Sequence, residues 1–278
     1  MIRKVFTMLA LALVLVACKD KTPPKKEVME PEKTEPIEQP ELSRFTDSVQ
    51  NLYQSFGLVE VTDPRIIVDL RYTTDNNFMG MVLYDTLDRL MLQQDVSERL
   101  SLCQDLLDSL HPGYRLKVFD GVRPLQVQRE MWEALDSIPP LNRGKFVSNP
   151  VFGSVHNFGT AVDITICDSL GNELDMGAGY DDFRPIAFPS REAYFLKTGE
   201  LTREQWESRK LLRRIMRSQR FSNIPSEWWH FNAFSRSTCE AKFEILLDES
   251  GNHQWWVSPK ILRDSSENSG DTLQSQLD

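Results

Sequence analysis

The stretch Ser154-Val-His-Asn-Phe-Gly-Thr-Ala-Val-Asp163-Ile164 places a histidine and an aspartate on either side of residues that can form a turn. Along a straight strand, the seven residues from His156 to Asp163 would span roughly 23 Å, so the two side chains could not reach one site. Asn157-Phe158-Gly159 offers the turn, since Asn and Gly adopt positive φ at little cost. The β-branched run Ile164-Thr165-Ile166 then predicts a buried strand that begins at Asp163.

A second short segment, Glu227-Trp-Trp-His230, supplies a further imidazole and a further carboxylate. Histidine is scarce, and these two segments hold two of the four histidines in the chain: His111, His156, His230 and His253. A catalytic zinc ion usually takes three protein ligands, imidazole and carboxylate among them, and leaves a fourth position for water. We therefore predict that His156, Asp163 and His230 bind one zinc ion per chain.

Glu227 has a different predicted role, that of the general base. It lies three residues before His230, close enough for its carboxylate to sit beside the metal without binding it. There it could take a proton from a metal-bound water. In an extended strand the two side chains would face opposite sides, so we expect the bend after Pro225-Ser226 to turn Glu227 toward the metal. These residues together predict a metal-dependent hydrolase.

Other interpretations fit parts of the same pattern. A histidine beside aromatic residues is often a hydrogen-bonded core residue, and a single aspartate in a turn is often a cap. Two histidines and one carboxylate also form the facial triad of non-haem iron oxygenases, although that chemistry leaves Glu227 without a role. A metal-stabilised binding module without catalysis is a third alternative, but such a module would be expected to lack the base.

The motifs Ser-x-His-x-x-Gly-x-Ala-x-Asp and Glu-x-Trp-His resemble those of the zinc D-alanyl-D-alanine peptidases related to the hedgehog fold. Within that group the chain is most similar to the D-alanyl-D-alanine dipeptidases of the VanX type. The resemblance covers about residues 60 to 235, and further segments follow in the family's order: Val68-Asp-Leu-Arg-Tyr72 with Asn77-Phe78, Asp120-Gly-Val-Arg-Pro124, Met176-Gly-Ala-Gly-Tyr-Asp181 and Leu211-Leu-Arg-Arg-Ile-Met216. One departure is Asn157-Phe158, where many relatives carry Ser-Arg. We expect this departure to alter the pocket rim and to leave the ligands intact.

Carried over position by position, the resemblance implies the same three zinc ligands and the same catalytic acid/base, Glu227. It also implies three further roles. Arg123 would stabilise the developing oxyanion, Asp181 would receive the free ammonium of a dipeptide, and Ser154 would lie beside the substrate. From residue type alone, Arg123 would be a surface ion pair, Asp181 a turn residue and Ser154 a turn cap.

The resemblance implies a zinc peptidase that hydrolyses free D-alanyl-D-alanine in cell-wall metabolism, with a short peptide as its partner. The alternative is a D,D-carboxypeptidase or endopeptidase that acts on the stem peptides of peptidoglycan. Asp181 discriminates between them, because a carboxylate that binds the substrate ammonium closes the site to long substrates.

The N-terminus predicts a bacterial lipoprotein. Arg3-Lys4 precede an apolar stretch, residues 5–17, which ends in Leu15-Val-Ala-Cys18. This is a signal-peptide pattern, and its end resembles the lipobox, whose cysteine becomes the lipid-modified first residue of the mature chain. A plain cleaved signal is the alternative. We expect Cys18 to anchor the chain in the cell envelope facing the periplasm, and Lys19 to favour the outer membrane over retention in the inner one.

The domain organisation follows from composition. Residues 1–18 form the predicted signal peptide, and residues 19–44 are rich in Lys, Glu and Pro, which predicts a disordered tether. Residues 45–257 are long enough for one domain, the zinc peptidase domain, and the polar residues 258–278 predict a disordered tail.

Within the domain, strands and helices are predicted without strict alternation. Apolar residues at helical spacing predict helices over 95–110 and 125–135, and Thr202 with Gln205 predicts a capping box for a helix that ends near 219. Strands are predicted at residues 66–72, 115–119, 161–166, 228–234 and 253–257. This mixture favours an α+β fold, and the resemblance implies a central antiparallel sheet with helices packed against it.

Charge and cysteine content narrow the function further. The formal net charge of −9 argues against a nucleic-acid partner, which prefers basic surfaces. Besides Cys18 there are three cysteines without CxxC spacing, and they support neither a disulfide framework nor a cysteine zinc site: Cys103, Cys167 and Cys239.

Overall fold

The computed structural model describes residues 46–250 of the chain. The predicted signal peptide, tether, tail and the strand at 253–257 lie outside these residues. In chain order the elements are α1 (Asp47–Ser55), β1 (Leu58–Glu60), β2 (Ile67–Val68), η1 (Arg71–Thr73), β3 (Met91–Gln93), α2 (Gln94–Leu110), β4 (Arg115–Asp120), α3 (Leu125–Ala134), α4 (Pro140–Arg143), η2 (Val155–Phe158), β5 (Ala161–Cys167), η3 (Pro185–Ala187), η4 (Pro189–Arg191), α5 (Glu192–Thr198), α6 (Arg203–Ser218), β6 (Ser222–Asn223), β7 (His230–Asn232) and α7 (Arg236–Lys242).

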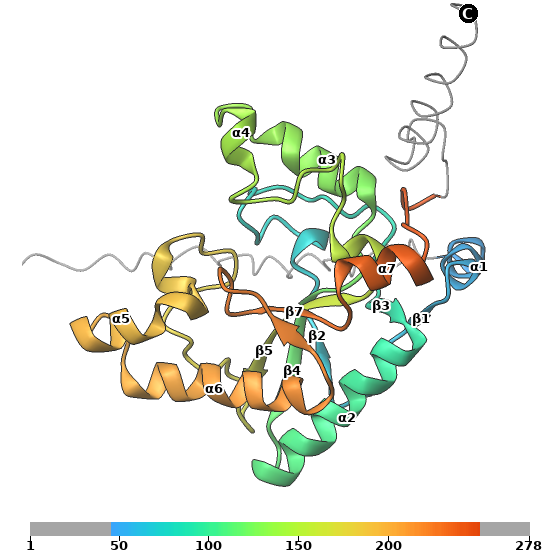
Figure 1. The fold of residues 1–278 in the computed structure, drawn as a ribbon. Helices are drawn as coiled ribbons and strands as arrows, with labels where there is room; N and C mark the ends of the chain where they lie inside the picture. The colour runs from blue at the N-terminus through green and yellow to red at the C-terminus, as the bar shows by residue number, and fades with distance from the viewer. Residues whose placement is uncertain (1–45, 251–278) are drawn as a thin grey trace, which may run out of the picture. The chain divides into compact units, whose positions relative to one another are not determined.

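A five-stranded sheet of order β2-β4-β5-β7-β6 forms the centre of the fold (Figure 1). Its neighbours pair antiparallel except β2 and β4, which run parallel at one edge. Strands β1 and β3 form a separate antiparallel pair. The structure confirms the predicted α+β class with a largely antiparallel central sheet.

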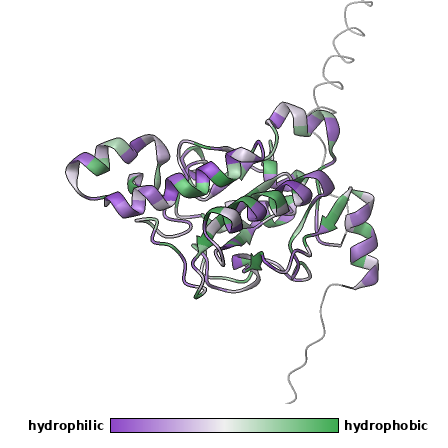
Figure 2. Ribbon diagram, turned by 90° about the horizontal axis from the view of Figure 1, so that it is seen from below, coloured by the Kyte–Doolittle hydropathy of each residue, from purple (hydrophilic) through white to green (hydrophobic). Residues whose placement is uncertain are grey.

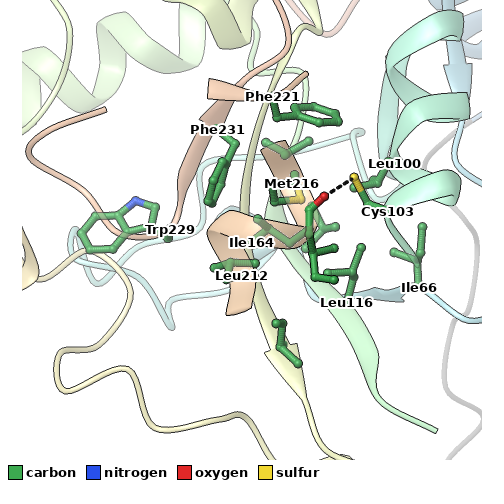
Figure 3. Packing of buried hydrophobic residues seen from close by; sticks show 14 of the residues in the cluster. Ile66, Leu100, Cys103, Leu116, Ile164, Leu212, Met216, Phe221, Trp229 and Phe231 are labelled. Atoms are coloured by element: carbon green, nitrogen blue, oxygen red, sulfur yellow. Dashed lines mark hydrogen bonds between the residues drawn. The ribbon is translucent and has the colours of Figure 1, made fainter. Parts of the chain in front are cut away.

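One face of the sheet packs against α2 and α6. Alternate residues of β5 (Val162, Ile164 and Ile166) join apolar side chains of the two helices in one buried cluster. Figure 3 shows Leu100 and Cys103 of α2 and Leu212 and Met216 of α6 gathered around Ile164, with the thiol of Cys103 directed at a backbone carbonyl. Because side chains alternate along a strand, the residues between them, including Asp163, point to the opposite face.

In Figure 2 the longer strands are mostly hydrophobic, while the helices alternate between hydrophilic and hydrophobic residues. A second buried cluster lies around α1, β1, β3 and α3, with Tyr53, Leu58, Met91 and Met131 among its members. None of the helices within residues 46–250 is long and apolar enough to cross a membrane.

The predicted helices agree with the structure to within a residue or two. The helix over 95–110 is α2, that over 125–135 is α3, and Thr202 and Gln205 form the predicted capping box at the start of α6. Two predicted strands were too long. The strand expected over 66–72 ends at Val68, because the chain turns into η1 and Thr73 bonds the carbonyl of Leu70 through its backbone and its hydroxyl. The strand expected over 228–234 covers only His230–Asn232, because Trp228 and Trp229 lie in a bend.

Candidate metal centre and active site

The predicted turn between the first two metal-binding candidates exists. The Oγ atom of Ser154 accepts a hydrogen bond of 3.0 Å from the backbone N–H of His156, and the Asn157 side chain completes a capping box around η2. Gly159 ends this turn with φ +67, a left-handed conformation that glycine adopts without strain. A side chain here would also collide with Leu58. The turn therefore delivers the chain into β5 with Asp163 close to His156.

The pairing of β5 with β7 sets the third candidate beside the second. Asp163 and His230 are direct partners across the two strands, and partners in an antiparallel pair point to the same face. The same register carries Asn232 to this face, two residues after His230. On the other side of β5, an irregularity in β4 between Val118 and Asp120 makes Asp120 the partner of Asp163. A bulge of this kind re-aims side chains, and here it brings Asp120 to the same face.

Three donor atoms converge at this point: Nε2 of His156, Nδ1 of His230 and Oδ1 of Asp163. The two nitrogens lie 3.1 Å apart, and Oδ1 lies 3.0 Å from the His230 nitrogen and 3.4 Å from the His156 nitrogen. Ligands about 2.0–2.2 Å from a tetrahedral zinc ion lie roughly 3.3–3.5 Å apart, close to these separations. Among the described residues, these three form the cluster of histidine, cysteine and acidic side chains that could hold a metal ion.

The outer nitrogen of each imidazole is fixed by an oxygen acceptor. Nδ1 of His156 lies 2.8 Å from the carbonyl oxygen of Gly121, and Nε2 of His230 lies 2.9 Å from Oδ1 of Asn232. A carbonyl oxygen can only accept, so each outer nitrogen carries a hydrogen and donates it. In the neutral rings both inner nitrogens then present lone pairs to the same point, which is the arrangement that metal-binding histidines require. The residues present therefore fit a zinc ion.

Charge within the cluster also suits a cation. Burial alone would raise the pKa of Asp163, but the charge and hydrogen bonds of His156 and His230 outweigh it and hold the pKa well below its ordinary 3.8. Burial lowers the pKa of His230, yet the hydrogen bond and charge of Asp163 raise it above 6.5. The buried carboxylate of Asp163 thus stays ionised, and it stabilises positive charge beside it, either a proton on His230 or a metal ion.

Glu227 lies next to the cluster but outside it. Its Oε2 atom is 4.0 Å from Nδ1 of His230, and the side chain is about one-quarter exposed (25%). Burial raises the pKa of Glu227 above the ordinary 4.5, with the positive charge of His230 opposing and the negative charge of Asp163 adding to the shift. A carboxyl group whose pKa is raised beside a metal site is better suited to accept a proton and to return it.

Arg123 is buried in the structure, so residue type alone suggested the wrong environment when it pointed to a surface ion pair. Its guanidinium donates two hydrogen bonds, of 2.9 and 2.6 Å, to Oδ2 of Asp120, and its Nη2 lies 3.6 Å from Oδ2 of Asp163. The guanidinium also lies over the ring of Tyr72 at 5.1 Å. Burial lowers the pKa of Arg123, but Asp120 more than restores it, so the group is a fixed cation at the wall of the site.

Asp181 and Ser154 both line the same cavity as the metal cluster. Asp181 has φ 58, and its carboxylate accepts a hydrogen bond of 3.3 Å from the hydroxyl of Tyr72. Burial raises its pKa well above the ordinary value, and the nearby charge of Asp163 raises it further. A cation placed beside Asp181 would relieve this repulsion. Ser154 acts as the turn cap, the role that its residue type suggested.

The cavity has a volume of about 630 Å³ and opens onto both the metal cluster and a set of aromatic side chains. Phe183 packs edge-on against Phe78 and Phe146, with ring centroids 5.0 Å apart in each pair. All three rings line the cavity and are partly exposed. The site thus combines a polar, charged floor with one apolar wall.

The expectation that Asn157 and Phe158 alter the pocket rim was wrong. Asn157 is fully buried, and its Nδ2 donates 2.7 Å to the carbonyl oxygen of Arg123. Phe158 is buried as well, and its carbonyl accepts from Gln93. These residues stabilise the turn on its buried side, because the capping box directs them into the interior.

Sequence reasoning missed the residues that support the ligands from outside. Asn232 fixes the ring of His230, Asp120 holds Arg123, and the hydroxyl of Tyr180 lies 3.2 Å from Oδ2 of Asp163. Asp120 and Tyr180 fall inside motif segments that mark the resemblance, but residue type and spacing do not reveal their roles. Asn232 had no such signal.

Comparisons with known proteins agree with this geometry. A family model described as D-ala-D-ala dipeptidase (Peptidase_M15) matches residues 55–245, well over half of the chain. The chain belongs to this family. As a member of the Peptidase_M15 family it is a hydrolase, and the predicted family is confirmed.

Curated relatives of the Peptidase_M15 chain include three named D-alanyl-D-alanine dipeptidases. That of Escherichia coli K12 is 32% identical over 186 residues, which is 67% of this chain and 86% of the relative. That of a Synechocystis strain is 28% identical over 169 residues (51% and 68%), and that of Enterococcus faecium is 25% identical over 178 residues (59% and 83%).

Solved structures similar to this family member include two with low sequence identity. The LdcB LD-carboxypeptidase, whose structure concerns peptidoglycan recognition, is 15% identical with a TM-score of 0.34, over 66% of this chain and 71% of that one. VanYB in complex with D-alanine-D-alanine is 16% identical with a TM-score of 0.30, over 63% and 89%.

Proposed function

We propose that this chain is a zinc-dependent dipeptidase that hydrolyses D-alanyl-D-alanine, with one zinc ion held by His156, Asp163 and His230. The observation that carries the proposal is the convergence of three donor atoms within 3.0–3.4 Å, next to a carboxylate, Glu227, that does not belong to the cluster. The names of the curated relatives support the choice of substrate.

When bound, zinc supplies Lewis-acid polarisation of a carbonyl group and a water molecule of lowered pKa. Glu227 then takes a proton from the attacking water and returns it to the nitrogen of the leaving D-alanine. Its carboxylate lies 4.0 Å from Nδ1 of His230, beside the three donor atoms and not among them, so it could accept a proton from a water held there. The raised pKa of Glu227 suits both halves of this proton transfer.

Arg123 faces the point where negative charge develops on the scissile carbonyl oxygen. Two hydrogen bonds to Asp120 hold the guanidinium in place before the reaction begins, so little reorganisation is needed when the charge appears. Asp181 receives the free ammonium of the dipeptide, which selects substrates with an unblocked amine.

A second candidate function is hydrolysis of longer or bulkier peptides, such as the stem peptides of peptidoglycan. The volume of the cavity favours it, because about 630 Å³ lies well inside the roughly 300–1,000 Å³ typical of pockets for much larger ligands than two alanine residues. The partly exposed rings of Phe78, Phe146 and Phe183 would give such a substrate an apolar contact. Asp181 supports the dipeptide, so the dipeptidase remains the main proposal.

The test compares three substrates with the purified, zinc-loaded chain: D-alanyl-D-alanine, its N-acetylated form, and muropeptides that end in D-alanyl-D-alanine. Release of D-alanine from the unblocked dipeptide alone supports the dipeptidase, and release from muropeptides alone supports the second candidate. Metal analysis accompanies the assay, because iron together with a need for a 2-oxo acid would indicate an oxygenase.

Glu227→Gln is the matched variant, since it keeps the shape of the side chain. We expect it to retain one zinc ion per chain and to lose about 10²–10⁴ in kcat, the usual contribution of a general acid/base. His156→Ala should lose both zinc and turnover. Full activity of Glu227→Gln would end the assignment of Glu227 as the base.

We also propose that the enzyme acts in the cell envelope, attached through a lipid on Cys18 and facing the periplasm. Support comes from the lipobox-like Leu15-Val-Ala-Cys18, which lies outside the described residues. Labelling with radioactive palmitate should mark the wild-type chain and leave Cys18→Ser unlabelled. Equal labelling of both would contradict the anchor.

A further inference from the structure

Four polar groups form a continuous hydrogen-bonded line from the metal cluster to the proposed amine site. Oδ2 of Asp163 lies 3.2 Å from the hydroxyl of Tyr180, which lies 3.2 Å from the hydroxyl of Tyr72, which lies 3.3 Å from Oδ2 of Asp181. Asp163 and Asp181 are the two ends of this line, and they are the groups proposed to bind the metal and the substrate ammonium.

Aromatic packing fixes both tyrosine rings. The Tyr180 ring lies between Phe119 and Trp229, with centroids 4.8 and 5.6 Å away. The Tyr72 ring is almost fully buried and packs edge-on against Tyr84 at 5.7 Å. Rings held in this way cannot swing to new partners, so only the hydroxyl hydrogens can change direction.

While Asp181 is ionised, two hydrogens must serve three contacts, because each tyrosine brings one hydroxyl hydrogen. If Tyr72 donates to Asp181 and Tyr180 donates to Asp163, the contact between the two hydroxyls has no hydrogen. If both hydrogens point toward Asp163, the contact with Asp181 has none. The line therefore has more than one arrangement, and the charge at its Asp181 end decides which arrangement is favoured.

A substrate ammonium bound to Asp181 changes that charge. Once the carboxylate accepts from the ammonium, it competes less strongly for the hydrogen of Tyr72. Tyr72 can then donate to Tyr180, and Tyr180 can donate fully to Asp163. Hydrogen bonds to the outer oxygen of a metal-binding carboxylate orient it and set its strength as a ligand.

We propose that Tyr72 and Tyr180 are positioning residues. Their hydroxyl groups couple the binding of the substrate amine at Asp181 to the orientation of the metal ligand Asp163. The proposal rests on the proposed function, which assigns those two carboxylates their roles. It predicts that zinc binding and dipeptide binding strengthen each other partly through the two tyrosine hydroxyl groups, because coupling between sites is reciprocal.

Tyr180→Phe tests the metal end, because it removes one oxygen and keeps the ring. We expect the zinc dissociation constant, measured with zinc alone by competition against a chromophoric chelator, to rise about 10–100-fold, as is typical when an outer partner of a metal ligand is lost. Tyr194→Phe is the control, since Tyr194 is 57% exposed. Equal unfolding temperatures of the metal-free proteins show that the fold is intact. Wild-type zinc affinity in Tyr180→Phe would overturn the proposal.

Tyr72→Phe tests the coupling. Its hydroxyl contacts Asp181 and Tyr180 but makes no hydrogen bond to Asp163, so zinc affinity without peptide should change less than about threefold. In a Glu227→Gln background, which binds substrate without consuming it, saturating D-alanyl-D-alanine should tighten zinc binding. Adding Tyr72→Phe should remove at least about fivefold of this tightening, the lower end of usual coupling energies.

Retention of the full tightening in Tyr72→Phe would overturn the coupling, because a merely structural tyrosine would leave it unchanged. Failure of the proposed function gives a different pattern. If D-alanyl-D-alanine is not a substrate, the parent Glu227→Gln shows no tightening of zinc binding and the wild type shows no turnover. The effect of Tyr180→Phe on zinc affinity without peptide does not depend on the substrate and is tested separately.

Discussion

Replacing Asp120 by asparagine should destabilise the enzyme strongly, although asparagine has nearly the same shape. The Asp120 side chain is fully buried and accepts four hydrogen bonds. Oδ1 accepts from the hydroxyl of Tyr84 at 2.6 Å and from the backbone N–H of Gly121 at 3.0 Å, and Oδ2 accepts from Nε and Nη2 of Arg123 at 2.9 and 2.6 Å.

The expected loss of stability follows from these four hydrogen bonds. An asparagine NH₂ group at either position faces two donors, so two hydrogen bonds are lost whichever way the amide turns. Whichever way the neutral amide turns, the buried guanidinium of Arg123 also loses its hydrogen-bonded counter-ion. Breaking one side of a buried pair costs about 3–5 kcal/mol, and a domain of this size loses roughly 2–4 °C per kcal/mol, so we expect the unfolding temperature to fall by about 6–20 °C.

Chemical denaturation of the zinc-loaded chain measures this free energy of unfolding. Glu60→Gln is the control, because its ion pair with Arg89 has both side chains about one-third exposed (33% and 36%), and it should change stability by less than about 1 kcal/mol. Asp120→Asn combined with Arg123→Gln removes both charges and should recover part of the loss. A change below about 1 kcal/mol in Asp120→Asn would contradict this role of the buried pair.

Three further outcomes are expected. Gly159→Ala should destabilise the domain by about 1–3 kcal/mol and weaken zinc binding, because it forces a side chain into φ +67 and against Leu58; calorimetry with zinc titration measures both. Zinc affinity should fall as pH is lowered through the pKa of His230, which Asp163 raises above 6.5, because the retained proton must leave before Nδ1 can bind; proton release measured in two buffers checks this. Asp181→Asn should raise KM for the unblocked dipeptide more than it lowers kcat, and a steady-state comparison with Asp182→Asn separates the two.

The sequence was sufficient for the turn and for the cluster, since both depend on residue type and on spacing. His156 and Asp163 could not reach one metal ion from a straight strand, so the predicted site required a turn, and the residue types of Asn157-Phe158-Gly159 allowed one. The buried strand that begins at Asp163 followed from β-branched residues. Helices were predictable because their apolar spacing and the cap at Thr202 are local features.

The supporting residues could not be predicted, because they depend on strand register. Asn232 reaches His230 only because β7 pairs with β5 as it does, and Asp120 reaches its place only through the irregularity in β4. The strand at 66–72 was predicted too long for a related reason. Alternating apolar residues do not reveal that the chain leaves the sheet after Val68 to carry Tyr72 into the site.

The polar residues of the site fall into two groups: some lie on strands of the sheet, and others lie in loops that can vary. Asp120, Asp163 and His230 form one row across three neighbouring strands, fixed by backbone hydrogen bonds. A slip of one residue in β7 would turn His230 to the opposite face, so the register that buries the apolar core also specifies the metal cluster. Asp181 and Glu227 lie outside the strands. Changes in these loops can therefore alter the substrate while the metal cluster stays the same.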